Sequence, residues 1–513
     1  MTEKNTMSPG SSPTKDLRFA LVTAAAFFCV NLFFALRHVM WRDEWMPLTV
    51  ARFTSGYGEF FEHIQYIGRH AFFSLCWLLE GADGSLGLFK VFIVLVSSVG
   101  VFVLCRYSPL SRWQKVLFAF GYYPLYEYGT ILRDYSVIGA LSIVCCALLN
   151  SARWRPLGFS IAIALLLQTN PFGLALACVL GATFVFDSWQ KGRLGPEVLG
   201  NYSAIGGGVL VACSFFAALK IMIPPPDVAE IVLGQPLRQD SHLVRLLESL
   251  PFPVRGWLPV PMFGTWNSQI LDPWPWTQIF LTFALITAII VILWPNKKAL
   301  FLFLIGMLGL GAVLCHLPWT ALRYHGPYFL LLVFAYWTLR SVPPEGKTDL
   351  AASGPVVWLR CHASAFMTGL LTIHVVVSVM FLLQEQVMPF SGSKEAAEII
   401  RKNAPADVPI IGDPDYLMIS LAGYLGREVY IASREEMGSF TKVDLRRRAT
   451  MLPPDELARV VGEQAQKHGR DLVLVTGYEI GMPPETGRLL GATRSITGEN
   501  YFVYLVKVTA TAP

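Results

Sequence analysis

An arginine and two acids, Arg42, Asp43 and Glu44, follow the first long apolar segment of this 513-residue chain, with Trp41 and Trp45 on either side. A charged side chain in lipid costs about 2.5 to 3.5 kcal/mol at mid-membrane and less at the edge, so adjacent acids there indicate a functional site. Carboxylates can accept a proton from a substrate or bind a hard cation. Tryptophans and charges also collect at helix ends on the membrane surface, so an interfacial helix cap is the alternative interpretation.

Arginines accompany these acids on the same face of the expected membrane domain. Before residue 385, the basic residues of that face are nearly all arginines: Arg42, Arg52, Arg69, Arg133, Arg238, Arg245, Arg255 and Arg323. Basic residues normally favour the cytoplasmic face, so their presence on the opposite face needs an explanation. The planar guanidinium group matches phosphate, which predicts an anionic ligand at the outer leaflet. We expect roughly half of these arginines to contact lipid headgroups or pair with acids instead.

The composition sets the class of the protein. Hydrophobic residues make up 54% of the chain and charged residues 15%, which is typical of a polytopic membrane protein. The apolar stretches long enough to cross a bilayer are 19–40, 86–105, 114–131, 135–151, 156–187, 203–223, 277–294, 298–317, 322–340 and 362–384. The stretch 156–187 is too long for one span and holds Asn170-Pro171 near its centre, which predicts a tight helical hairpin. The sequence therefore predicts about eleven transmembrane helices.

Basic residues orient these spans. Lys4, Lys15 and Arg18 precede the first span and place the amino terminus in the cytoplasm by the positive-inside rule. The predicted cytoplasmic turns carry Arg106, Arg112, Lys115, Arg153, Arg155, Lys191, Arg193, Lys297, Lys298, Arg340, Lys347 and Arg360. Eleven spans then put residues 385–513 outside the cytoplasm, on the same side as Asp43.

Four segments of the chain meet on that outer face. The first, 41–85, contains two apolar pieces, 44–64 and 71–79, that are expected to form helices lying on the membrane surface. The other three are the turn 126–135, the proline- and tryptophan-rich external loop 224–276, and the segment 315–327. A site on this face would be built from all four.

The tail 385–513 has the pattern of a small α/β domain. Helical patterns cover 393–403, 414–425 and 455–468, and expected strands cover 408–412, 428–431 and 472–476, with a terminal strand pair within 488–508. Asp413-Pro414-Asp415 mimics the Asp-x-Asp motif with which soluble transferases hold a metal ion and a nucleotide sugar. Proline makes this segment a strand-to-helix turn instead.

Cysteine and histidine usage predicts no built-in metal or disulfide chemistry. None of the nine cysteines falls in 224–276 or 385–513, so these external parts have no disulfide framework. The chain has no Cys-x-x-Cys or His-Glu-x-x-His motif, which predicts no metal site built by the protein alone and no required cofactor. Asp43 and Glu44 are hard oxygen ligands, so a divalent cation bound jointly with substrate is left open.

The chain resembles the polyprenyl-phosphate-dependent membrane glycosyltransferases of the GT-C superfamily, which include protein O-mannosyltransferases and the lipid A aminoarabinose transferase. The resemblance covers most of the chain and rests on Asp43-Glu44 after the first span, on Gly68-Arg69-His70, on Arg133-Asp134-Tyr135, and on Arg323-Tyr324-His325-Gly326-Pro327. It implies a polytopic α-helical membrane domain, 1–384, and a small α/β domain outside the cytoplasm, 385–513. Many relatives follow the basic residue of the second interfacial helix with a proline pair, whereas Ala71-Phe72 follows His70 here, which puts the subfamily in doubt.

The resemblance also implies a reaction and its residues. In such enzymes an acid of the first external loop activates the acceptor, which by position is Asp43, with Glu44 as its orienting or sugar-binding neighbour. A sugar linked to a lipid phosphate has an ionised leaving group, so one base and fixed positive charge suffice, and a single displacement inverts the anomeric centre. Arg69, Arg133 and Arg323 are the phosphate candidates. The substrate-binding candidates as a whole are Arg42, Arg69, His70, Arg133, Asp134, Tyr135, Arg323, Tyr324 and His325.

The expected enzyme is a hexosyl- or pentosyltransferase of the bacterial inner membrane with a periplasmic carboxy-terminal domain. Its expected partners are a polyprenyl-phosphate sugar, a lipid, glycan or protein acceptor and membrane lipids, with no nucleic acid. A transporter or lipid-linked-glycan flippase is the alternative. Transporters place charges near the midplane and often have two related halves, whereas the charges here cluster at one face and no internal repeat is found. A third option is an O-antigen-ligase-like enzyme, which usually lacks a terminal α/β domain.

Overall fold

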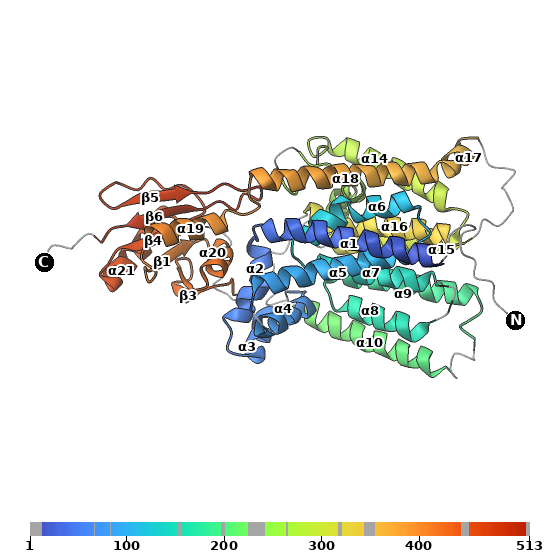
Figure 1. Ribbon diagram of the computed structural model, residues 1–513, viewed down its shortest axis with the longest axis horizontal. Coiled ribbons are helices and arrows are strands. Elements are labelled where there is room, and N and C mark those ends of the chain that lie inside the picture. Colours follow the sequence, from blue (N-terminus) through green and yellow to red (C-terminus); the bar gives the residue numbers. More distant parts are fainter. Residues whose placement is uncertain are drawn as a thin grey trace.

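The computed structural model describes residues 13–65, 67–82, 84–151, 153, 155–195, 201–223, 242–262, 265–315, 321–342, 354–442 and 451–508. Two parts follow each other along the long axis of the molecule (Figure 1). The larger part is a bundle of helices that run roughly along this axis, and the smaller part is an α/β unit at one end. Helix α18 (Ala363–Val387) runs the length of the bundle and leads into the α/β unit.

Seven helices in the described part of the chain are long and apolar enough to cross a membrane. They are α1 (Pro13–Arg37), α5 (Leu86–Tyr107), α9 (Pro171–Gln190), α10 (Tyr202–Met222), α14 (Pro275–Leu293), α15 (Lys297–Leu314) and α18. Two shorter apolar helices, α7 (Tyr135–Leu149) and α8 (Pro156–Leu167), lie among them, together with the buried helix α16 (Gly326–Arg340). These ten helices occupy nine of the ten predicted stretches, while the count of about eleven spans stays a prediction.

The one predicted stretch that these helices do not occupy, 114–131, is not a continuous α-helix. It divides into α6 (Arg112–Ala119) and the π-helix η1 (Tyr122–Thr130). Pro124 lies in the first turn of η1 and has no backbone N–H to continue an α-helical hydrogen-bond ladder. Hydrophobicity alone predicts a span here, because a proline leaves the stretch apolar even though it interrupts the helical hydrogen bonds.

The predicted hairpin within 156–187 is confirmed. Helices α8 and α9 pack against each other and are joined by residues 168–170. The Asn170 side chain accepts hydrogen bonds from Phe172 N at 2.9 Å and Gly173 N at 3.0 Å, and Pro171 occupies the first position of α9. An asparagine cap followed by proline is a strong helix start, so this dipeptide reverses the chain.

Short helices gather at the end of the bundle that faces the α/β unit. Figure 1 shows α2 (Arg42–Arg52), α3 (Tyr57–Ile64) and α4 (His70–Ala82) there. The 3-10 helix η3 (Leu322–His325) contacts α2 through Arg323 and Asp43, α13 (Phe252–Trp257) packs on η3, and α12 (His242–Ser249) precedes α13 in the chain. The predicted short helices in 44–64 and 71–79 thus correspond to α2, α3 and α4. Part of the predicted loop 224–276, including Arg238, lies outside the described residues. Its described remainder carries α12 and α13, so it is not an irregular loop throughout.

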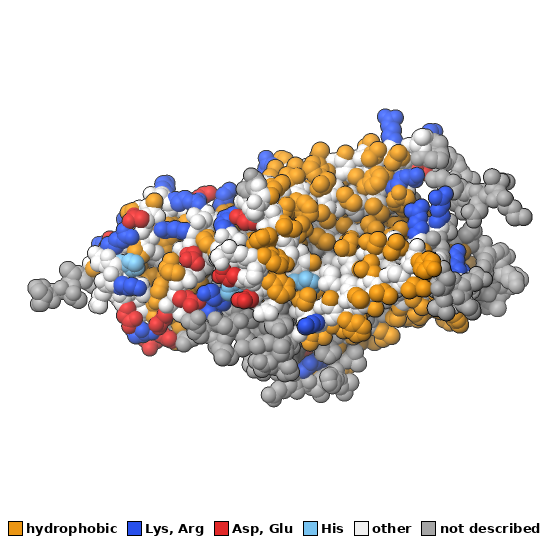
Figure 2. All heavy atoms as spheres, turned by 90° about the horizontal axis from the view of Figure 1, so that it is seen from below, with side chains coloured by type: hydrophobic (Ala, Val, Ile, Leu, Met, Phe, Trp, Pro, Cys, Tyr) orange, Lys and Arg blue, Asp and Glu red, His pale blue; other side chains and the backbone are white. Residues whose placement is uncertain are grey.

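The surface of the molecule changes character along its long axis. Hydrophobic side chains cover much of the bundle on the face drawn in Figure 2, whereas Lys, Arg, Asp and Glu are mixed over the α/β unit. Further Lys and Arg side chains appear at the opposite end of the bundle, which is the end where Figure 1 shows α17 (Gly354–Cys361). An apolar belt between two charged ends is the arrangement that a membrane-spanning bundle requires.

The α/β unit is built on one six-stranded sheet with the strand order β3-β2-β1-β4-β6-β5. The strands are β1 (Ile410–Asp413), β2 (Val429–Ile431), β3 (Glu436–Gly438), β4 (Leu472–Thr476), β5 (Gly487–Ala492) and β6 (Phe502–Val506). Strands β2, β1 and β4 are parallel, and the others are antiparallel to their neighbours. Helices α19 (Ser393–Asn403), α20 (Asp415–Leu425) and α21 (Pro454–His468) cover the sheet.

Both faces of this sheet are buried, which explains its sequence pattern. Along β4, Val473 and Val475 belong to one hydrophobic cluster, while Leu472 and Leu474 belong to the cluster on the other face. A strand buried on both faces reads as a continuous apolar run, as expected for the parallel core of an α/β layer structure. The predicted helices and strands of the tail are all found, and among the tail residues that the structure describes, 385–442 and 451–508, the three-residue strand β3 is the element that was not predicted.

The α/β unit contacts the bundle mainly through α20, which packs on α2. The ring of Trp45 on α2 lies edge-on to Tyr424, with 4.9 Å between ring centroids. It also lies directly over Gly423 of α20, where any added Cβ would come within 2.4 Å of the ring. This glycine therefore allows the close approach of the two helices.

We expect Gly423→Ala to weaken the contact between the two parts of the protein. Its new methyl group must displace the buried Trp45 ring, and overpacking of this kind costs about 1 to 3 kcal/mol. Gly462→Ala is the matched control, because Gly462 lies in helix α21 with no atom within 4 Å of the added Cβ. There the change should stabilise the helix by up to about 1 kcal/mol. Thermal unfolding of the purified full-length variants measures both effects, and equal responses would contradict the packing argument.

Candidate active site

Asp43 lies in the first turn of α2, directly after the end of α1. The chain turns at Trp41, whose backbone is extended, and the Glu44 carboxylate accepts a hydrogen bond from Trp41 N at 3.1 Å. Free backbone N–H groups and the helix dipole favour negative charge at such a position. The local sequence therefore fixes Asp43 at the junction between the bundle and the α/β unit.

Two arginines from distant parts of the chain meet Asp43. Arg133 lies immediately before α7, and its Nη2 is 3.1 Å from Asp43 Oδ2. Arg323 lies in η3, and its Nη2 is 3.6 Å from the same oxygen. The Asp43 side chain keeps 27% of its surface exposed, whereas the side chains of Arg133 and Arg323 keep 1% and 8%. The carboxylate is thus reachable, and the two positive charges behind it are nearly enclosed.

These arginines have spare hydrogen-bond donors. While Arg133 Nη2 faces Asp43 in the ion pair, Arg133 Nε and Nη1 and Arg323 Nε are buried and have no hydrogen-bond partner among the described residues. The indole Nε1 of Trp41 is in the same state, and the Trp41 ring lies 5.9 Å from the Arg133 guanidinium carbon and 5.4 Å from that of Arg323. Buried polar groups are normally hydrogen-bonded. Converging unpaired donors with positive charge can accept an anion, so we call this cluster of Arg133, Arg323 and Trp41 beside Asp43 the candidate anion site, or anion site for short.

The same charges set the acidity of Asp43. Burial by itself would raise the pKa of this carboxyl group, but the guanidinium groups of Arg133 and Arg323 outweigh burial. Arg69 and Arg42 act in the same direction. The pKa of Asp43 consequently lies well below its usual range, and the group is ionised at physiological pH.

Glu44 faces away from this anion site. Its carboxylate accepts hydrogen bonds from the backbone N–H groups of Trp41 and Leu132, at 3.1 and 2.6 Å, and pairs with His38 at 2.9 Å. It thereby ties the start of α2 to the segment that carries Arg133. Asp43 and Glu44 direct their oxygens to different partners, so this arrangement does not form a two-carboxylate cation site. A divalent ion bound jointly with substrate stays an expectation.

His38 sits between two buried carboxylates. Its Nε2 is 2.9 Å from Glu44, and its Nδ1 is 2.9 Å from Glu385 near the end of α18. The Tyr126 hydroxyl also donates to Glu385 at 2.6 Å. Burial lowers the pKa of His38, but the charges of Glu44 and Glu385 prevail and raise it to about 10. The imidazolium form therefore links α1, α2 and α18 at neutral pH.

The stability of the protein should depend on pH through His38. A histidine with a raised pKa stabilises the folded state fully below its unfolded pKa of about 6.5, and this contribution is lost as pH rises toward 10. Glu385→Gln should lower the pKa of His38, narrow the pH range over which this stabilisation is lost, and lower the unfolding temperature at pH 7 by roughly 1 °C for each kcal/mol lost. Glu59→Gln, at the exposed His63–Glu59 pair of α3, is the control and should leave the profile unchanged. Unfolding temperatures between pH 6 and 10 test this, and a flat wild-type profile would refute it.

A second polar cluster adjoins the first. Arg69 Nε is 3.9 Å from Asp134 Oδ2, and the Asn170 amide donates to the same oxygen at 2.5 Å. His70 instead contacts Gln168 Oε1 at 2.9 Å. The predicted residues Arg69 and Asp134 thus lie together at the edge of the anion site, and His70 is held by the turn between α8 and α9.

The predicted aromatic residues occupy different surroundings. Tyr324 accepts a hydrogen bond from Arg323 at 3.0 Å, and Tyr135 lies 5.4 Å from the Arg133 guanidinium carbon, so both border the anion site. The fully buried His325 ring stacks on Phe252 of α13 with 4.8 Å between centroids. The packing of η3 against α13 therefore determines the position of His325.

Arg42 connects the site to the α/β unit. Its guanidinium carbon lies 4.6 Å above the Tyr416 ring of α20 and 5.3 Å from the ring of Trp41. The nine predicted substrate-binding residues thus fall into three groups. Arg42, Arg133, Tyr135, Arg323 and Tyr324 surround Asp43; Arg69 and Asp134 form the adjacent cluster; and His70 and His325 pack beside neighbouring helices.

Another buried acid next to the site was not among the residues predicted from the sequence. Glu127 of η1 is 1% exposed and accepts hydrogen bonds from the Tyr122 hydroxyl at 2.8 Å and Trp266 Nε1 at 3.2 Å. The Trp266 ring lies 5.0 Å from Trp41 and 5.2 Å from the Arg323 guanidinium carbon. The signal was available, because Glu127 is a lone acid in an apolar stretch, which is the argument that singled out Asp43.

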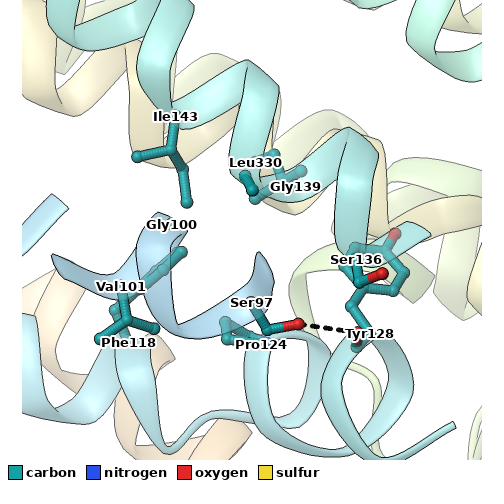
Figure 3. A pocket seen from close by; sticks show the side chains of 11 residues that line it. Ser97, Gly100, Val101, Phe118, Pro124, Tyr128, Ser136, Gly139, Ile143 and Leu330 are labelled. Carbon is teal, nitrogen blue, oxygen red and sulfur yellow. Dashed lines mark hydrogen bonds between the residues drawn. The ribbon is translucent and has the colours of Figure 1, made fainter. Parts of the chain in front are cut away.

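A small pocket lies elsewhere in the bundle, between α5, α7 and η1 (Figure 3). Its lining consists of Ser97, Gly100, Val101, Phe118, Pro124, Tyr128, Ser136, Gly139, Ala140, Ile143 and Leu330. The Ser97 hydroxyl is already used, since it donates to the Tyr128 carbonyl at 3.3 Å. The lining has no acid or basic side chain and therefore does not compete with the Asp43 cluster as a site for an anion.

Comparison with known proteins identifies the fold. No family model matches the chain, and no curated protein matches it. Among solved structures, apo ArnT from Cupriavidus metallidurans is similar with a TM-score of 0.53 and 10% identity, over 98% of this chain and 100% of that one. ArnT bound to undecaprenyl phosphate gives a TM-score of 0.49 at 12% identity, again over 98% and 100% of the two chains. The mycobacterial arabinofuranosyltransferase AftD gives 0.33 at 12% identity, over 96% of this chain and 40% of its own. The chain therefore has the fold of apo ArnT from Cupriavidus metallidurans.

Proposed function

We propose that the protein is an inverting glycosyltransferase that moves a monosaccharide from a polyprenyl-phosphate-linked donor to a hydroxyl acceptor. The observation that carries this proposal is the partly exposed Asp43 carboxylate facing Arg133 and Arg323, three of whose buried N–H nitrogens, Arg133 Nε and Nη1 and Arg323 Nε, lack hydrogen-bond partners among the described residues. One base and a set of fixed cations is what such a reaction needs. The ArnT-like fold supports the membrane setting.

The reaction would proceed in one displacement. Asp43 takes the proton of the acceptor hydroxyl while its oxygen bonds to the anomeric carbon. The bond between that carbon and the phosphate oxygen breaks, and its electron pair leaves with the phosphate. Arg133 and Arg323 stabilise the charge that develops there. The phosphate is a good leaving group without protonation, so no second acid is required, in contrast to glycoside hydrolysis.

Donor binding would also make the Asp43 carboxylate a stronger base. In the free protein the two arginines keep the pKa of Asp43 well below its usual range, which makes it a weak proton acceptor. A bound phosphate would share the charge of Arg133 and Arg323, so the pKa of Asp43 would rise. The carboxylate would then be a stronger base when a donor is present.

The remaining assignments follow from distance to this centre. Arg42, Arg69, Asp134, Tyr135 and Tyr324 would line the donor and acceptor positions. Glu44, His70 and His325 would hold these groups in place. We place the site at the periplasmic face of a bacterial inner membrane, with the amino terminus in the cytoplasm, a transmembrane domain of 1–384 and a periplasmic domain of 385–513. A lipid, glycan or protein of the cell envelope would be the acceptor.

Reconstituted vesicles test this function. Full-length protein receives a polyprenyl phosphate carrying a radiolabelled hexose or pentose, together with an envelope lipid fraction as acceptor. The expected result is label transferred to the acceptor with inverted anomeric configuration, and none with Asp43→Asn. Movement of the intact donor across the bilayer without transfer would instead identify a transporter and overturn the proposal.

A further inference from the structure

A buried acid of the α/β unit touches the helix that carries Asp43. Glu499 lies between β5 and β6 and is 3% exposed. Its carboxylate accepts hydrogen bonds from the Ser391 and Ser420 hydroxyls, which belong to the same part of the chain. It also accepts one from Arg42 N at 3.3 Å. Arg42 is the first residue of α2, so this last contact crosses from the α/β unit to the active-site helix.

Other contacts surround the same turn of chain. Met40 N donates to the Tyr424 hydroxyl at 2.9 Å, and the Ser393 hydroxyl donates to Met40 O at 3.3 Å. The Arg42 guanidinium lies over Tyr416, and Trp45 packs on Gly423 and Tyr424 as described above. The segment from residue 40 to residue 45 is therefore held by the α/β unit on either side of Asp43.

We propose that Glu499 is a positioning residue for Asp43, acting as a carboxylate cap on the amino-terminal N–H of α2 that is supplied by the α/β unit. This inference rests on the proposed function for its catalytic consequence. A carboxylate that accepts from a backbone N–H at a helix start stabilises that start through hydrogen bonding and the helix dipole. Asp43 is one residue further on, so the cap fixes the first turn from which its side chain extends.

The charge of this cap can change near neutral pH. Burial raises the pKa of Glu499 to about 7, although the Arg42 charge and the Ser391 hydroxyl act against burial. Asp43 adds to the rise. The remaining titratable groups that face Glu499 are Tyr416, Tyr424 and Tyr501. A carboxylate accepts more strongly than a carboxylic acid, so the cap should tighten as pH rises through 7.

Hydrogen exchange measures the cap without any substrate. Full-length protein in detergent micelles is compared with Glu499→Gln, which keeps the size and one acceptor oxygen, and with Glu463→Gln, an exposed glutamate of α21, as control. After correction for intrinsic rates, the amides of residues 40–45 should exchange about fivefold faster in Glu499→Gln, because a charged acceptor is replaced by a neutral one. The control should match wild type. Unchanged protection in Glu499→Gln would overturn the proposal.

Enzyme kinetics separate positioning from simple structural support. In the transfer assay, Glu499→Gln should lower kcat severalfold, leave the donor KM unchanged and remove a rise in kcat centred near pH 7. Wild-type kcat and pH dependence in that variant would refute positioning, even if exchange were faster. If the wild-type protein transfers no sugar, the proposed function fails by itself. The exchange result then decides whether Glu499 caps α2.

Discussion

We expect Asp43→Asn to lower the rate of sugar transfer by about a thousandfold or more, within the range that a general base contributes. Asparagine has nearly the same shape and keeps one oxygen toward Arg133, but it cannot take the proton of the acceptor hydroxyl. The amount of protein in the membrane and its unfolding temperature should stay close to wild type, because Asp43 is partly exposed. Initial rates with a labelled donor measure the loss.

The same variant should bind the donor lipid more tightly. Removing the carboxylate takes away the negative charge that now neutralises Arg133 and Arg323, so both become available to a phosphate. Binding of undecaprenyl monophosphate, used as a probe in detergent, should strengthen severalfold while turnover is lost. Asp16→Asn, an acid at the other end of α1 that pairs with Arg112, is the control and should change neither quantity. Full activity in Asp43→Asn would end the assignment of the base.

Much of the architecture could be predicted from the sequence, because the signals are local. Apolar segment length located the long helices, and the α8–α9 turn followed from Asn170 and Pro171. In the described part of the tail, period-two and helical patterns located each helix and each strand except β3. The division of 114–131 into α6 and η1 was missed, since Pro124 perturbs hydrogen bonding and leaves the hydrophobicity of the stretch unchanged.

The site could be predicted only in part, because its geometry depends on contacts between distant segments. The place of Asp43 at the membrane edge and the family resemblance pointed to Asp43, Arg133 and Arg323, which do meet. Adjacency in sequence made Glu44 a partner of Asp43. The side chains of neighbouring helical residues point in different directions, and Glu44 turns to His38 and Leu132 instead. Glu499 lies more than 450 residues from Arg42, so no local pattern could connect them.

The second large effect is expected at Arg323. Arg323→Gln should weaken binding of undecaprenyl monophosphate and lower the transfer rate by about a hundredfold to a thousandfold, as loss of one oxyanion donor does. Arg323→Lys should recover part of the binding, since it restores the charge without the planar fork that suits phosphate. Arg52→Gln is the matched control. Arg52 lies on the same helix as Asp43 but pairs with Glu80 at 2.7 Å, so its loss should leave donor binding intact.

Combining the two changes tests whether Asp43 and the arginines act as one unit. Tighter binding in Asp43→Asn requires that the freed arginines are present, so most of this gain should disappear in the Asp43→Asn, Arg323→Gln double variant. Residues in direct contact are expected to show such non-additivity, with coupling energies of about 0.5 to 3 kcal/mol. Additive effects on binding would mean that Asp43 does not compete with the phosphate for Arg323. The proposed rise in the basicity of Asp43 on donor binding would then have no physical basis.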